Sequence, residues 1–143
     1  MGNGCGRNNV YSTKFGEHIL KASQVITSFA KKEGLNPQVV LHTVAYIVKN
    51  KMGFILSKND TVVLFYEIAP KTYECHIATM DSPITLMKSM TDIFSRLHKL
   101  NVKKMYGHAD NFEIVSLMRR IVSRVGGELK VSDIKDYNWM ITL

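Results

Sequence analysis

Two side chains that can accept a proton, Glu74 and His76, stand two positions apart in the β-like run 71–80. Alternate residues of a strand share a face, so this spacing predicts that the carboxylate and the imidazole project from the same face of the strand. Carboxylates and imidazoles are common proton acceptors in general acid–base catalysis, which makes both residues candidates for a general base. A solvated sheet face, or a hydrogen bond that is satisfied within the fold, is the alternative interpretation of the same two residues.

Cys75 lies between them in sequence but on the opposite face of the strand, so it cannot exchange a proton with His76. We therefore predict that Cys75 is a small core residue and not a nucleophile. The five histidines of the chain show no pair at ligand spacing with a supporting acid or cysteine. His108 and Asp110 form a conceivable two-ligand loop, but a polar cluster at a helix start explains them more simply, and no metal site is predicted.

Basic residues gather in the second half of the chain, and two of them, Arg120 and Arg124, share one face of a predicted helix. That face could hold the phosphates of a nucleotide or of a nucleic acid. No aromatic residues are interleaved with it, as base stacking would require, and a solvated cationic helix face is the alternative. The clustered cations are Lys88, Arg96, Lys99, Lys103, Lys104, Arg119, Arg120, Arg124 and Lys130.

The 143 residues include 19 Lys+Arg and 12 Asp+Glu, a formal net charge of +7, and 45% of them are hydrophobic. This length indicates one domain with a sizeable core, and the hydrophobic fraction excludes a disordered chain. No apolar stretch reaches the ~20 residues that span a bilayer, and the polar start resembles no signal peptide. Two cysteines cannot build a disulfide framework, which favours a reducing compartment and a cytoplasmic location. The charge leaves nucleic acid, anionic lipid, an anionic cofactor or an acidic protein as partners.

Residues 1–11 are rich in glycine and are predicted to form a flexible tail ahead of a single domain over residues 12–143. Gly2 meets the first requirement for N-myristoylation, but Gly6 stands where that signal needs Ser or Thr, which argues against a lipid anchor. Hydrophobic periodicity within the domain predicts the element order ααβββαβαββ. The expected helices cover 12–34, 36–51 and 83–100, and a further helix capped by Asp110 or Asn111 runs to residue 125. The expected strands cover 54–57, 62–68, 71–80, 102–107, 128–131 and 137–143.

Strands interleaved with helices predict an α/β fold with a mixed sheet that is covered on both faces. The unit from residue 71 to residue 107 is expected to be a right-handed crossover between two parallel strands. Where its first strand leads into the N-terminus of a helix, free backbone N–H groups and the positive end of the helix dipole can bind an anion.

This order of elements resembles the GNAT N-acetyltransferase superfamily from Ser12 onward. The stretch from Asn111 to Gly126-Gly127 is similar to the second conserved region of that family, in which an Asn opens a helix that a glycine ends. The short length and weak motifs are most similar to small, divergent members carried by bacteriophages, some of which are virion proteins. The resemblance implies a GNAT-like acyl-CoA N-acyltransferase fold and transfer of an acetyl group from acetyl-CoA to an amine.

The resemblance also implies roles for individual residues. Glu74 stands where the family often has its general base, and Glu74 or His76 would assist direct attack of the amine on acetyl-CoA. The backbone amides of Ile77 and Thr79 would hold the pantetheine arm, and residues 82–86 the pyrophosphate. The implied cofactor contacts in these later segments are Ser82, Ile84, Thr85, Leu86 and Asn111.

Two features depart from the family. Its Gln/Arg-x-x-Gly-x-Gly/Ala loop is replaced by Asp81-Ser82-Pro83-Ile84-Thr85-Leu86, which has neither glycine nor arginine. Glycines let the backbone close on a pyrophosphate, and the carboxylate of Asp81 would repel one. The general-acid tyrosine, seven residues after Asn111, is replaced by Met118. Three hypotheses remain: an acetyltransferase that binds acetyl-CoA weakly, a non-catalytic interaction module such as a phage virion component, and a nucleic-acid-binding domain.

Overall fold

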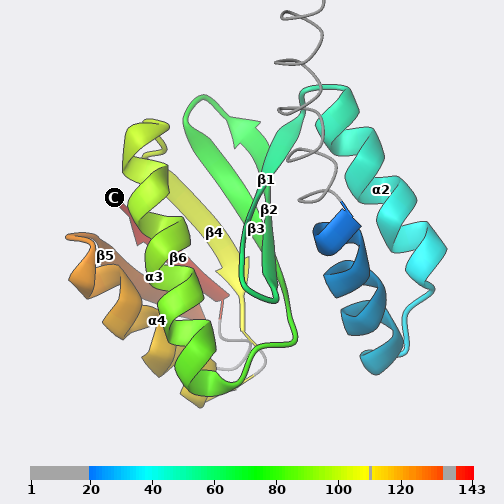
Figure 1. Cartoon of the computed structure of the whole chain (residues 1–143). Coiled ribbons are helices and arrows are strands. Elements are labelled where there is room, and N and C mark those ends of the chain that lie inside the picture. Colours follow the sequence, from blue (N-terminus) through cyan, green and yellow to red (C-terminus); the bar gives the residue numbers. More distant parts are fainter. Residues whose placement is uncertain (1–19, 110, 134–137) are drawn as a thin grey trace, which may run out of the picture.

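A computed structural model of the protein describes residues 20–109, 111–133 and 138–143 (Figure 1). The predicted tail over residues 1–11 and the start of the first predicted helix lie outside the described residues. The first helix is described over residues 20–32, and the other elements follow in the predicted order. They are α2 (Pro37–Lys49), β1 (Gly53–Lys58), β2 (Thr61–Ala69), β3 (Thr72–Thr79), α3 (Pro83–Lys99), β4 (Lys104–His108), α4 (Phe112–Arg124), β5 (Glu128–Asp133) and β6 (Asn138–Thr142).

The strands form one mixed sheet in the spatial order β1-β2-β3-β4-β6-β5. β1, β2 and β3 form an antiparallel meander, and β4, β6 and β5 are also antiparallel neighbours. One parallel ladder, between β3 and β4, joins the two halves of the sheet. The prediction of a crossover between parallel strands is thus confirmed, with α3 as the connecting helix.

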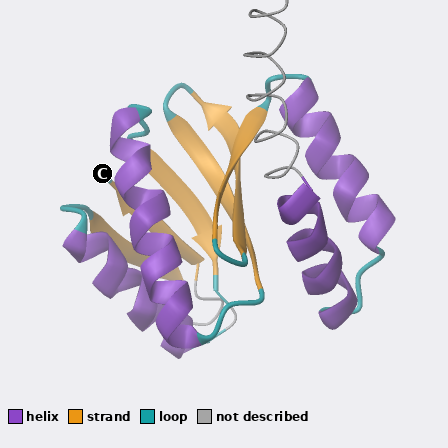
Figure 2. Cartoon of the chain, in the orientation of Figure 1, coloured by secondary structure: helices purple, strands orange, loops and turns teal. Residues whose placement is uncertain are grey.

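Helices lie on both sides of this sheet (Figure 2). The first helix and α2 pack on one face through a small apolar cluster that includes Ile26, Val44 and Val62. α3 and α4 pack on the other face, where Phe65 of the sheet and Phe94 of α3 belong to the main hydrophobic core. The prediction of a mixed α/β fold with both faces of the sheet covered is confirmed.

Local sequence explains where several elements begin and end. The side chain of Asn36 accepts hydrogen bonds from two backbone N–H groups at the start of α2, and Pro37 occupies the first helical position. Asn59 adopts a φ of 51° in the two-residue turn between β1 and β2, a conformation that Asn tolerates well. Gly126 follows α4 with a φ of 82°, which ends the helix as predicted.

The β4 strand begins two residues later than the predicted range 102–107. Val102 is buried in the core ahead of the strand, which explains its apolar character without a place in the ladder. The backbone N–H groups of Lys103 and Lys104 both donate to the carbonyl oxygen of Lys71, directly before β3. The chain therefore first comes alongside β3 at Lys103 and Lys104, and not at Val102.

Candidate functional site

Glu74 and His76 share a face of β3, as the strand alternation predicts, and the structure adds that their side chains are in contact. His76 Nε2 is 2.8 Å from Glu74 Oε1, and the two side chains are 60% and 47% exposed, respectively. In this arrangement the carboxylate accepts the Nε2 proton and orients the imidazole, which leaves Nδ1 as the nitrogen that can take up a further proton. The two candidates therefore form a single acid–base pair that is open to solvent.

Two tyrosines flank Glu74 in the sheet. Tyr66 of β2 and Tyr106 of β4 are its Cα partners, and partners in adjacent strands project to the same face. The helix pair packs on β3 at Ala78, beyond this position, and Tyr106 is 37% exposed. Sequence analysis missed Tyr106 because only the parallel register brings it beside Glu74.

The ladder between β3 and β4 ends at this same position. Its last pair of described partners is Glu74 and Tyr106, whereas β3 continues to Thr79 and β4 to His108. Beyond Glu74, then, β3 has β2 as its only strand partner among the described residues. The sheet is open between its two halves at the carboxyl ends of β3 and β4.

The backbone amides of Ile77 and Thr79 face this opening. The N–H of Met80 donates to the carbonyl oxygen of Asp60, which places residues 80, 78, 76 and 74 in the positions that bond to β2. Donors alternate along a strand, so the N–H groups of Ile77 and Thr79 point away from β2. They are the two amides that the resemblance assigns to the pantetheine arm.

The start of α3 carries the residues assigned to the pyrophosphate. The Ser82 hydroxyl contacts Thr85 Oγ1 at 3.1 Å and does not cap the helix. The Leu86 N–H donates to Ser82 O at 2.7 Å and is engaged within the helix. The N–H groups of Ile84 and Thr85 belong to the first turn, where an α-helix offers no internal acceptor, and they remain able to bind an anion.

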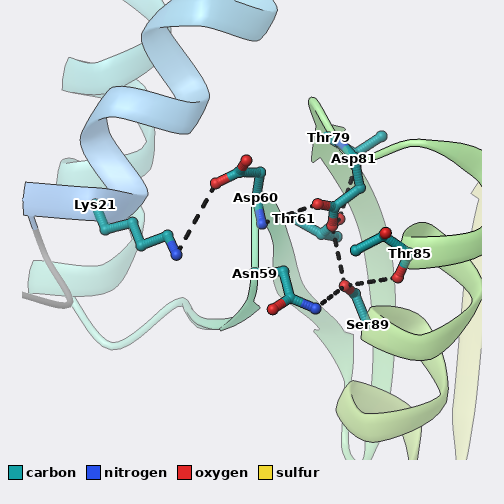
Figure 3. A network of polar contacts seen from close by, with 8 residues as sticks. All are labelled: Lys21, Asn59, Asp60, Thr61, Thr79, Asp81, Thr85 and Ser89. Atoms are coloured by element: carbon teal, nitrogen blue, oxygen red, sulfur yellow. Dashed lines mark hydrogen bonds and ion pairs between the residues drawn. The ribbon is translucent and has the colours of Figure 1, made fainter.

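Asp81, directly before α3, belongs to a polar network that sequence analysis did not foresee (Figure 3). Its Oδ2 accepts hydrogen bonds from Thr61 Oγ1 at 2.6 Å and from Ser89 Oγ at 2.9 Å. Its Oδ1 accepts one from the N–H of Asp60 at 3.2 Å. Thr61 and Ser89 are fully buried. The carboxylate thus ties the turn between β1 and β2 to the end of β3 and to α3.

Two residues of the later helix have structural roles. Asn111 Oδ1 accepts a hydrogen bond from the N–H of Ile114 at 3.0 Å and caps α4, as predicted. Met118, at the position of the family's tyrosine, is 2% exposed and packs in the main core. No proton donor can act from that position in this chain.

Cys75 is buried in the same core, as predicted. Burial raises the pKa of its thiol, with the charge of Glu74 as a smaller cause, so the thiol stays protonated and unreactive. Within the described ranges, no three His, Cys, Asp or Glu side chains are grouped so that they could hold a metal ion. No helix in those ranges has the length and apolar character needed to cross a membrane.

Solved structures that are similar to this chain include the following three. Tetrahymena GCN5 has a TM-score of 0.50 and 12% identity, over 88% of this chain and 86% of that chain. The ribosomal-protein-S5-alanine acetyltransferase of Vibrio fischeri has a TM-score of 0.46 and 9% identity, over 74% and 68%. A Bacillus subtilis acetyltransferase in complex with CoA has a TM-score of 0.41 and 14% identity, over 68% and 81%. No protein-family model and no curated protein sequence matches the chain.

The strand order, the single parallel crossover and the likeness to GCN5 define a GNAT acetyltransferase fold. The predicted fold is therefore confirmed. At 12% identity the likeness concerns the fold alone, and an activity has to be argued from the residues of the site.

Proposed function

We propose that this protein transfers an acetyl group from acetyl-CoA to an amine, with Glu74 and His76 removing the proton of the amine. The observation that carries the proposal is the 2.8 Å contact between Glu74 Oε1 and His76 Nε2, beside the point where the β3–β4 ladder ends. An ammonium group has to lose a proton before it can attack a thioester, and an oriented imidazole is suited to accept that proton. The GNAT fold supports the reaction class.

In the proposed reaction Glu74 holds the Nε2 proton of His76, and Nδ1 takes a proton from the substrate ammonium. The neutral amine attacks the acetyl carbon and the C–N bond forms. The nitrogen, positively charged after the attack, releases its second proton to solvent, and the C–S bond breaks with its electron pair leaving on sulfur. The leaving sulfur then needs a proton. Tyr106 shares a sheet face with Glu74 and is the proposed donor, because Met118 is buried at the family's position.

The residues of the site fit the pantetheine arm of acetyl-CoA better than they fit its pyrophosphate. The amides of Ile77 and Thr79 provide donors for an extended arm along the open edge of β3, in the manner of an added strand. The amides of Ile84 and Thr85 and the α3 dipole favour a pyrophosphate, whereas the carboxylate of Asp81 opposes one. We therefore expect acetyl-CoA binding to be weak.

The test is release of free CoA from acetyl-CoA in the presence of a panel of primary amines. Glu74→Gln and His76→Ala are each expected to lower kcat at least about 100-fold, because general-base catalysis contributes on that order. Glu67→Gln is the matched control, since it removes an exposed carboxylate from the neighbouring strand β2. Turnover that is unchanged in both site variants would refute the assignment of the base.

A non-catalytic interaction module is the second candidate function. Two features favour it. Met118 is buried where the family's enzymes have a general-acid tyrosine, and Asp81 is held in a structural network where they have a pyrophosphate-binding loop. The basic exterior would then meet an acidic partner, for instance in a phage virion or in the host cytoplasm. Calorimetry with no acetyl-CoA binding up to about 1 mM, together with a gene located among capsid and tail genes, would support this function over the enzyme.

A further inference from the structure

The outward side of α4 carries a cationic surface that the proposed reaction does not use. Five side chains of this helix line a hollow of about 480 Å³. They recur at intervals of three and four residues, so they occupy one side of the helix. We refer to them as the α4 arginine face; they are Ser116, Arg119, Arg120, Ser123 and Arg124.

The side of α4 opposite to the α4 arginine face packs in the core and so keeps the arginine face turned toward solvent. Val115, Met118, Ile121 and Val122 are buried in the main core, so α4 cannot rotate without exposing them. Arg124 Nη1 also contacts the sulfur of Met87 in α3 at 3.5 Å, which restrains that side chain. The cationic groups are therefore held toward solvent on a rigid element.

The guanidinium groups of this face have no acidic partner among the residues that the structure describes. Arg96 of α3, in contrast, lies 3.1 Å from the carboxylate of Asp92. None of Arg119, Arg120 and Arg124 makes an ion pair with any residue in the described part of the chain, and Arg124 donates a hydrogen bond to the sulfur of Met87. Three uncompensated guanidinium groups with two hydroxyl groups between them match the hydrogen-bonding needs of phosphate oxygens.

The residues that line the hollow favour a nucleic-acid strand over a single nucleotide as the ligand. All five residues come from one helix and none is aromatic or apolar, so the hollow itself offers no platform on which a base could stack. The exposed ring of Phe112, four residues before Ser116, is a single aromatic and makes no series of stacking sites. Recognition then goes mainly through phosphates. The rise from Ser116 to Arg124 is about 12 Å, which spans roughly three to four phosphates of one duplex strand.

We infer that the α4 arginine face binds the phosphate backbone of a double-stranded nucleic acid, independently of its sequence. The contact is electrostatic and releases counterions, so its affinity falls with salt in proportion to the number of phosphates that are contacted. The inference does not depend on acetyl transfer, because none of its residues belongs to the site on β3.

The test is fluorescence anisotropy with two DNA duplexes of about 20 base pairs and unrelated sequence, titrated at several salt concentrations. Arg120→Ala with Arg124→Ala is expected to lower the slope of log K against log salt by about 1.8. Between 50 and 200 mM salt this corresponds to a roughly twelvefold smaller loss of affinity than in the unmodified protein. Arg119→Gln with Arg120→Gln is a second variant that leaves the Arg124 contact with Met87 in place.

Lys31→Ala with Lys32→Ala is the matched control, because it removes the same charge from exposed positions at the end of the first helix, on the other side of the sheet. Equal losses in the control and in the arginine variants would overturn the inference, as would the absence of binding at 50 mM salt. Displacement of the duplex by CoA at equal phosphate concentration would assign the face to the co-substrate. Equally tight binding of poly-glutamate would assign it to acidic proteins, and either result refutes the nucleic-acid proposal.

Discussion

Replacing Asp81 by alanine tests whether the network before α3 holds three elements together. The carboxylate accepts two hydrogen bonds from the buried hydroxyls of Thr61 and Ser89 and a longer one from the N–H of Asp60. The alanine variant loses all three contacts. One hydrogen bond between the β1–β2 turn and α3 then remains among the described side-chain contacts. Asn59 Nδ2 donates it to Ser89 Oγ at 3.0 Å.

The size of the effect follows from what remains after the change. Ser89 Oγ also lies 2.9 Å from the carbonyl oxygen of Thr85, and Thr61 Oγ1 lies 2.7 Å from Thr79 Oγ1, so neither hydroxyl is left without a partner. The loss is then that of two charge-assisted hydrogen bonds at about 1.5 kcal/mol each, with a small addition from the third. We expect the free energy of unfolding to fall by about 3 kcal/mol and Tm by about 10 °C.

The assay is urea denaturation followed by circular dichroism, with Asp92→Ala as the control. Asp92 makes a half-exposed ion pair with Arg96 four residues later on α3, and its loss should cost about 1 kcal/mol or less. Asp81→Asn keeps a carbonyl oxygen as acceptor and should lie between the control and the alanine variant. An Asp81→Ala protein within about 1 kcal/mol of the unmodified protein would refute the account of the network.

Two further predictions concern the core. Gly107→Ala is expected to destabilise the protein by about 3 kcal/mol, because an added Cβ would overlap the buried indole ring of Trp139; a calorimetric Tm within about 2 °C of the unmodified protein would contradict this. Cys75 is expected to resist a thiol reagent at pH 8 in the folded protein and to react once in denaturant, since burial raises its pKa. A Cys5→Ser background isolates its signal, and rapid labelling without denaturant would contradict its burial.

The elements of this fold were predictable because their signals are local. Asn36 and Pro37 start α2, Asn59 permits the turn after β1, and Gly126 ends α4, each within a few residues of the feature it controls. The pairing of β3 with β4 carries no such signal in sequence. Its register depends on how the whole of α3 packs, and it decides that Tyr106 stands beside Glu74.

The candidate site was predictable only along a single strand. Strand alternation was enough to place Glu74 and His76 on one face and Cys75 in the core. The partners of Asp81 lie 20 residues before it and 8 residues after it, too far for any periodicity to connect. The signal that existed was the presence of polar residues, Thr61 and Ser89, at positions that otherwise point into the apolar core.

The early end of the β3–β4 ladder also bears on self-association. An unpaired strand at the rim of a sheet can recruit a strand of another molecule, and such edges promote aggregation. Here the unpaired stretch of β3 lies inside the sheet, and the chain continues on its far side with β4, β6 and β5. The strands on the far side of the opening therefore hinder a foreign sheet from extending β3 at Ile77 and Thr79, so the early end of the ladder leaves free backbone donors without creating an exposed sheet edge.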